Sequence, residues 1–227
     1  MKISAKVFLL ALALLLVEAG AADRWVRKHY ISLGAGVDFT QGDLDGKTKL
    51  ESSGTDYEEK VFAPNLGTYI IPDIEIGANL NMHTIFVDFM YSIPETNFGK
   101  GTSYVDETET SLWRLGLGYR YNFFWPEPFQ VSVGLSYSFM YLTTTDNAYY
   151  ENDDGNGRSD ATMMGNGFAL EAGLSYFLTR HVSMSMDGRF RTMFFSSVST
   201  DENGKCDLDD VFVQFTEEVV VRVGYHF

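Results

Sequence analysis

The sequence predicts an all-β protein, an eight-stranded antiparallel up-and-down transmembrane β-barrel. Three observations lead to this fold class. Eight segments alternate apolar and polar residues with a period of two, which is typical of strands that have two different faces. The connections between these segments alternate strictly between short and long. Aromatic residues, which make up 15% of the chain, gather at the ends of the apolar faces, where the interfaces of a membrane select them.

Residues 1–22 have the pattern of a secretory signal peptide. Two lysines precede an uninterrupted apolar run over residues 7–17, and small residues follow it. This order predicts export, with cleavage after Ala21 or Ala22 and a mature barrel domain over 23–227. The run is shorter than the roughly 20 apolar residues that a membrane-spanning helix needs. A closed barrel is the other structure that satisfies every backbone hydrogen bond in lipid.

Each predicted strand is defined by its apolar face. In chain order these faces run over Ile31 to Phe39, Ile74 to Leu80, Ile85 to Tyr91, Trp113 to Tyr121, Phe129 to Tyr141, Phe168 to Leu178, Val182 to Phe190 and Val213 to Phe227. The second strand is less regular from about Leu66 onwards, where it contains Pro72. Glu217 is the one charged residue on the apolar face of the last strand. We expect either a position near the upper membrane interface or a bulge that shifts the register there.

The connections predict which end of the barrel is which. Short connections are expected at residues 81–84, 122–128 and 178–181, and long ones at roughly 41–65, 94–110, 143–163 and 197–210. Outer-membrane barrels have short periplasmic turns and long extracellular loops, whereas a soluble sandwich mixes the lengths. The four long connections together carry the whole formal net charge of −14. An acidic outer rim repels nucleic acid and attracts cations.

The C-terminus carries the residues of a family resemblance. The chain ends in an aromatic residue that is preceded at every second position by apolar or aromatic residues, in the series Val219, Val221, Val223, Tyr225 and Phe227. This ending resembles the assembly signal of outer-membrane barrels. With the signal peptide and eight strands, the chain resembles the small OmpA/OmpX-type barrels, the outer membrane protein beta-barrel domain, and is similar in size to OmpW-like barrels.

The resemblance implies a location and a set of partners. We expect an integral protein of the Gram-negative outer membrane, in contact with membrane lipid and lipopolysaccharide. The C-terminal strand would be recognised by the barrel-assembly machinery. No nucleic acid partner is expected, and the sequence names no extracellular ligand. The single cysteine, Cys206, excludes an intramolecular disulfide in an exported chain.

Charged residues lie on the strand faces opposite to the apolar ones. The eleven that we expect to line the barrel interior are Asp38, Glu75, Asp88, Arg114, Arg120, Glu171, Asp187, Arg189, Arg191, Glu218 and Arg222. Acids and bases are nearly balanced, as expected where buried charges must be paired. An eight-stranded barrel is just wide enough for side chains to fill it. We interpret the set as a charged plug that fixes the strand register; the alternative is a narrow gated pore or a ligand pocket.

Two acidic stretches invite comparison with calcium loops. Asp154, Asn156 and Asp160 alternate oxygen-bearing side chains as calcium ligands do, and residues 201–207 are similar. Both stretches put a cationic residue where a ligand is wanted, and neither has the glutamate that completes an EF-hand loop. We therefore favour a solvated acidic loop, with no resident metal and no cofactor.

The histidines argue against catalysis. Enzymes among outer-membrane barrels, such as proteases, lipid A deacylases and palmitoyltransferases, resemble one another in using a histidine near the extracellular rim. The predicted topology instead puts His29, His83, His181 and His226 at the periplasmic end, so we expect no enzyme. The leading hypothesis is a structural or surface-interaction barrel, serving membrane integrity or adhesion through acidic extracellular loops. The alternative is OmpW-like passive transport of a small solute, which requires an apolar cavity or a lateral gap instead of a charged plug.

Overall fold

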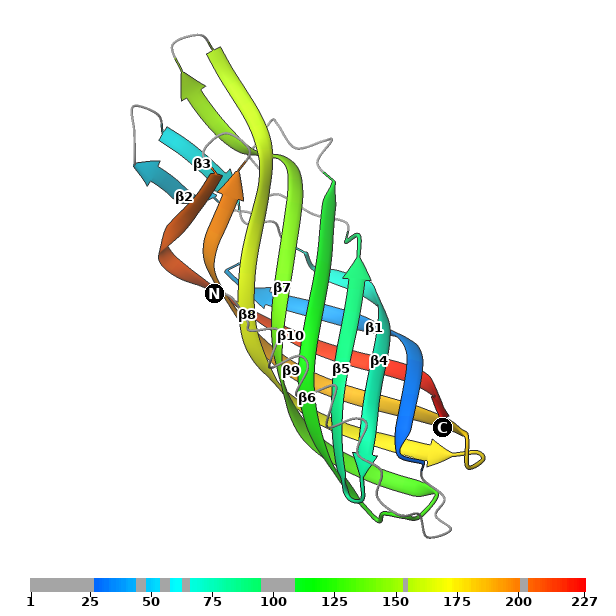
Figure 1. The fold of residues 1–227 in the computed structure, drawn as a ribbon. Helices are drawn as coiled ribbons and strands as arrows, with labels where there is room; N and C mark the ends of the chain where they lie inside the picture. The colour runs from blue at the N-terminus through cyan, green and yellow to red at the C-terminus, as the bar shows by residue number, and fades with distance from the viewer. Residues whose placement is uncertain are drawn as a thin grey trace.

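The computed structural model describes residues 27–43, 48–53, 58–62, 66–94, 109–152, 155–200 and 204–227. All of their regular elements are strands (Figure 1). The predicted signal peptide lies outside the described residues. No helix in the described part of the chain is long and apolar enough to cross a membrane.

Eight strands close into an antiparallel barrel. They are β1 (His29–Gly42), β4 (Thr68–Leu80), β5 (His83–Ser92), β6 (Thr110–Phe123), β7 (Phe129–Asn152), β8 (Gly155–Phe177), β9 (Val182–Thr200) and β10 (Gly204–His226). Each pairs with the next barrel strand in the sequence, and β1 pairs with β10 to complete the ring. The predicted up-and-down barrel is therefore confirmed. Closure leaves no free strand edge in the membrane, which lipid would not tolerate.

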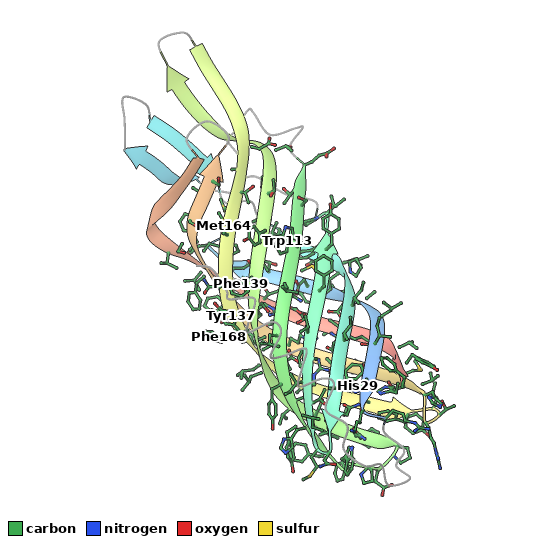
Figure 2. All side chains as sticks on the ribbon, in the orientation of Figure 1. His29, Trp113, Tyr137, Phe139, Met164 and Phe168 are labelled. Carbon is green, nitrogen blue, oxygen red and sulfur yellow. The ribbon has the colours of Figure 1, made fainter. Side chains whose placement is uncertain are left out.

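The residues that alternate with a period of two in the sequence lie alternately on the outer and inner faces of the barrel wall. Between β1 and β10 the register runs without a break from Tyr30 opposite His226 to Gly42 opposite Gln214. Along the wall, exposed apolar residues alternate with buried ones. Figure 2 shows outward side chains such as Tyr137 and Phe168 on the outer surface, where their rings lie 5.1 Å apart across β7 and β8. The outer wall is thus an apolar band made for lipid.

Aromatic pairs mark the two ends of this band. Near the loop end, Trp113 on β6 stacks on Tyr141 on β7, with ring centroids 4.1 Å apart. Near the turn end, Tyr121 contacts Phe123 edge-on at 4.9 Å, and the His83 ring lies 5.5 Å from that of Tyr121. On β6 the two levels are eight residues apart, from Tyr121 to Trp113.

The extracellular connections differ from expectation. Much of the segment predicted as a loop over 143–163 is strand, because β7 and β8 continue to Asn152 and Gly155. The segment 41–65 contains two short strands that were not predicted, β2 (Thr48–Ser53) and β3 (Glu58–Phe62). Above the membrane neither strand face meets lipid, so the alternation that reveals a strand disappears while the backbone pairing continues.

These extensions form a sheet beyond the barrel. Strand β2 pairs with β3, and β3 pairs with the upper part of β7, with Lys60 opposite Tyr149. The upper parts of β7 and β8 pair up to Asn152 opposite Gly155. Figure 1 shows these four strands projecting past the end of the barrel at the upper left. We call β2, β3 and the upper parts of β7 and β8 the extracellular sheet.

The pairing of Phe86 with Gly118 provides a test of the interior packing. The Phe86 ring occupies the space of a side chain at position 118, and the Arg120 guanidinium lies 3.9 Å from its centroid. Gly118→Ala should lower the free energy of unfolding by about 1–3 kcal/mol, because overpacking displaces the ring. The measurement is urea unfolding in detergent micelles, followed by tryptophan fluorescence.

Gly188→Ala is the matched control for this substitution. A Cβ there meets nothing closer than the Ala172 carbonyl oxygen at 3.9 Å. Its unfolding midpoint should stay at the wild-type value, and equal losses in the two variants would contradict the packing argument.

Candidate functional site

The charged residues assigned to the interior are buried inside the barrel. All eleven expose 8% of their surface or less, and Arg120 exposes the most. Among the described residues, every barrel strand except β7 contributes at least one of them. Strand β7 instead turns small polar side chains inward, among them the fully buried Ser136 and Ser138. We call the buried charges and Asp73, described next, the lumen charge network.

Asp73 belongs to this network and was not predicted. It is 1% exposed and accepts a hydrogen bond from Nε of Arg222. The residue pattern around Pro72, at the start of the second predicted strand, is irregular, so Asp73 was not assigned to the inward face. Glu75 lies two residues further along β4, and residues two apart on a strand point to the same face. This alternation could have assigned Asp73 to the interior. The network therefore holds seven carboxyl groups against five guanidinium groups.

Arg189 is the centre of the network. Its guanidinium nitrogens lie 3.3 Å from carboxylate oxygens of both Asp88 and Glu75. Three more carboxylates lie 3.6–3.7 Å away, those of Asp73, Glu171 and Glu218. A guanidinium carries five N–H donors in a fixed fork, so one arginine can face several acids at once. One cation thus links acids from β4, β5, β8 and β10.

Two bidentate pairs cross the interior. Arg114 on β6 donates to both carboxylate oxygens of Glu218 on β10, at 2.6 and 2.9 Å. Arg120 on β6 donates to both oxygens of Glu75 on β4, each at 2.6 Å. Neither pair joins neighbouring strands. Bidentate arginine–carboxylate pairs are strong and geometrically specific. The Arg114–Glu218 pair joins strands on opposite sides of the barrel, the Arg120–Glu75 pair joins strands separated by β5, and both occupy the interior.

A second interior layer is apolar and lies nearer the extracellular end. On β6 and β9 it begins at Leu112 and Met193, which lie one inward position beyond Arg114 and Arg191. Its buried members are Leu66, Tyr69, Ile71, Met90, Leu112, Met140, Leu142, Ala161, Met163, Met193, Phe195, Val198 and Phe212. Met90 and Met140 lie opposite Arg114, where the two layers meet. We call this set the upper apolar layer. The sequence analysis missed it, because it treated the inward face as polar throughout.

The four histidines lie at the turn end, as the topology predicted. His29 and His83 begin β1 and β5, His181 lies in the turn before β9, and His226 ends β10. The His226 ring nitrogen Nε2 lies 2.7 Å from the Ser183 hydroxyl oxygen. Its Nδ1 has no hydrogen-bond partner, so this pair lacks the carboxylate that orients the histidine of a serine triad.

The remaining predicted positions fall on β8, on β10 and outside the described residues. Glu217 faces outward in an unbroken register, opposite Phe39 and Phe190, so no bulge shifts the strand there. The residues of the C-terminal series from Val219 to Phe227 also face outward; their role in assembly stays a prediction. Asp154 lies outside the described residues, and Asn156 and Asp160 lie on β8. The described residues include no group of three or more His, Cys, Asp or Glu that could hold a metal, and the calcium hypothesis stays a prediction.

Comparison with known proteins identifies the family. The family model described as "Outer membrane protein beta-barrel domain" matches residues 7–227. The chain belongs to this family. It is therefore an integral β-barrel protein of the bacterial outer membrane. No curated protein matches the sequence.

Solved structures of outer-membrane barrels are similar in fold. The chain matches AlkL in lipid bilayers with a TM-score of 0.52 and 15% identity, covering 93% of this chain and 95% of AlkL. OprG from Pseudomonas aeruginosa gives 0.50 and 13%, covering 90% and 100%. Neisserial surface protein A gives 0.47 and 18%, covering 88% and 97%. At these identities the likeness to AlkL and OprG shows the fold alone.

Removing the central arginine of the lumen charge network should be costly. Arg189→Met leaves five neighbouring carboxylates short of one cation, and breaking a buried ion pair on one side costs about 3–5 kcal/mol. We expect a large fall in the urea midpoint in detergent micelles, read by the shift between folded and unfolded bands on a gel. Arg27→Met, at an exposed arginine, is the control and should leave the midpoint unchanged. A normal midpoint for Arg189→Met would show that the network does not depend on this residue.

Proposed function

We propose that this barrel is closed to solute flow and works as a surface-interaction protein through its extracellular sheet. The observation that carries the proposal is the contrast between a filled interior and an extended exterior. The filled interior stabilises the barrel. The strands that continue beyond the membrane are not needed to span it, which favours a role for them in binding.

Two successive layers support a closed passage. The lumen charge network crosses the barrel with bidentate pairs between strands that are not neighbours. The upper apolar layer lies above it and is at most 6% exposed. An ion on its way through would have to separate buried pairs and also cross an apolar layer. Both steps are costly in a medium of low dielectric constant.

The extracellular sheet supports a role in binding. The part of β8 from Gly155 to Ser159 pairs with β7 on one side, while pairing with β9 begins only at Ala161. Strand β2 ends the strand order at the other edge. Within the described residues, both edges therefore offer backbone N–H and C=O groups that a partner strand can use. The acidic composition of the long connections favours a cationic partner.

A second candidate function is passive transport of a small apolar solute. The upper apolar layer favours it, because four of its members are methionines, Met90, Met140, Met163 and Met193. Methionine side chains are flexible and adapt to different occupants. The lumen charge network lies below this layer, so such a solute would have to leave sideways through the wall.

Conductance separates a closed barrel from a pore. Refolded protein in a planar bilayer should give no single-channel steps, because the lumen charge network and the upper apolar layer fill the passage. The same sample must show a heat-modifiable folded band, and a known porin serves as the positive control for the assay. Steady, reproducible conductance would overturn the closed barrel.

Shortening the extracellular sheet tests the binding role. Replacing residues 146–159 by Asn-Gly removes the open edge of β8 together with the part of β7 that pairs with β3, and leaves the barrel strands intact. Cells of a laboratory Gram-negative strain that display the full chain should adhere to epithelial monolayers, and cells with the shortened chain should not. Equal adhesion at equal surface levels of folded protein would contradict the proposal.

A further inference from the structure

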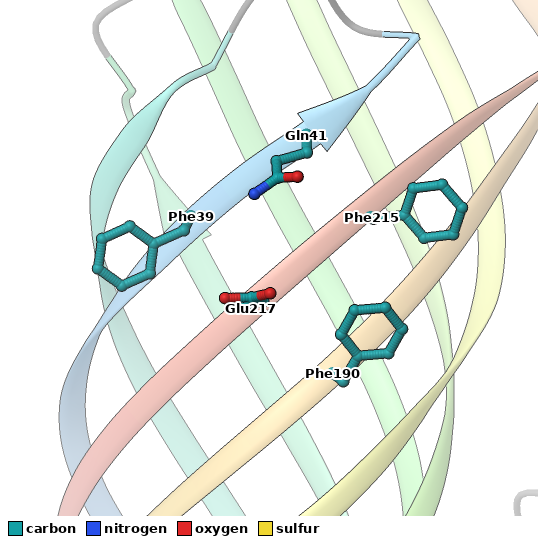
Figure 3. Close-up of a pocket in the computed structure, with 5 residues that line it drawn as sticks. All are labelled: Phe39, Gln41, Phe190, Phe215 and Glu217. Carbon is teal, nitrogen blue, oxygen red and sulfur yellow. The ribbon is translucent and has the colours of Figure 1, made fainter.

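The lipid-facing wall carries a pocket built around a single carboxylate. It has a volume of about 250 Å³ and is lined by Phe39, Gln41, Phe190, Phe215 and Glu217 (Figure 3). These residues come from β1, β9 and β10. The pocket is separate from the lumen charge network, because Glu217 and Glu218 point to opposite faces of β10.

The strand register builds this pocket. Glu217 lies directly between Phe39 on β1 and Phe190 on β9. One outward position higher, Phe215 lies opposite Gln41. The rings of Phe190 and Phe215 stack with centroids 6.2 Å apart and an interplanar angle of 21°. In Figure 3 the Glu217 carboxylate lies between Phe39 on one side and these two stacked rings on the other.

The pocket lies at the extracellular edge of the apolar band. Glu217 is eight residues from Tyr225 along β10, the same separation as between Tyr121 and Trp113 on β6. Trp113 belongs to the upper aromatic level, where it stacks on Tyr141. Glu217 therefore reaches the depth at which lipid head groups meet the protein, and its cost of facing the membrane is smallest there.

The described residues supply no cation to this carboxylate. Among the described residues, none forms an ion pair or a hydrogen bond with Glu217. The five arginines of the barrel wall all point inward. A second copy of the chain would bring the same outer wall, and the described part of that wall has no lysine or arginine at this depth. A positive charge that pairs with this carboxylate would therefore come from outside the described residues, and at this depth the surrounding membrane can provide it.

We propose that the pocket binds the ammonium group of a membrane lipid. A carboxylate supplies the opposite charge, and the faces of phenylalanine rings attract cations. The Gln41 amide oxygen adds a neutral acceptor. A divalent metal ion fits less well, because calcium takes six to eight oxygen ligands and the aromatic lining provides none. The lipid's acyl chains would lie along the apolar wall below.

Lipid retention in native mass spectrometry tests this site. The folded full chain is released from nanodiscs of equal parts phosphatidylethanolamine, which has an ammonium group, and phosphatidylglycerol, which has none. The wild type should retain phosphatidylethanolamine about fivefold over phosphatidylglycerol, the order expected for one cation–aromatic and carboxylate contact. Glu217→Gln keeps the shape and removes the charge, and should abolish the preference. Phe190→Leu should weaken it.

Phe89→Leu is the control, because it removes an outward aromatic residue from β5, a strand that pairs with none of the pocket strands β1, β9 and β10. It should retain the wild-type preference. All variants must show the same heat-modifiable band, so that loss of folding is separated from loss of binding. Equal retention by wild type and Glu217→Gln would overturn the proposal. So would retention of phosphatidylglycerol that appears only with added Mg²⁺, which would make the pocket a metal-bridged phosphate site.

Discussion

The pairing of β1 with β10 is the constraint on which the rest of the structure depends. Lipid offers no partner to an unpaired N–H or C=O group, so the sheet has to close. Closure with eight strands sets an interior too narrow for a wide channel. Alternate side chains must then enter that narrow space, whatever their chemistry. Every charge that enters has to find a partner there, since an isolated buried charge is very costly. The lumen charge network follows from this geometry, with Arg189 facing five carboxylates.

Because the interior is filled, a binding role falls to the two remaining surfaces of the protein. The outer wall faces lipid, and the extracellular sheet faces the medium. Strands β7 and β8 are nearly twice as long as β4, and the excess lies beyond the membrane. Pairing with β3 stabilises this excess, because an isolated two-stranded hairpin is marginal in water. The same barrel therefore gives a rigid base to a sheet whose two edges pair with no further strand in the described part of the chain.

The barrel was predictable because lipid imposes a strong pattern on sequence. Leu33, Leu170 and Val223 face outward because the alternation requires it, and all three do so in the structure. Where lipid is absent the pattern fails, and the upper parts of β7 and β8 were taken for loops. Asp73 was missed beside Pro72, although its parity with Glu75 points inward. The upper apolar layer was missed for another reason. The alternation of residues along a strand tells which ones point inward, but it does not tell whether the inward residues of a filled barrel are polar or apolar. The packing of the interior decides whether an inward residue is polar or apolar. Met90 on β5 lies opposite Arg114 on β6, so an apolar and a charged inward residue are direct neighbours.

Glu217 shows how a departure from the pattern carries information. An outward charge on an apolar wall is disfavoured, and the continuous register shows that the chain does not turn it inward. Phe39 and Phe190 lie on either side of it on the two neighbouring strands, and neither can neutralise a carboxylate. Aromatic rings around a carboxylate are poor partners for the acid itself but good partners for a cation that the acid attracts. The arrangement becomes favourable once such a cation is added, which is the physical reason to look for it in the membrane.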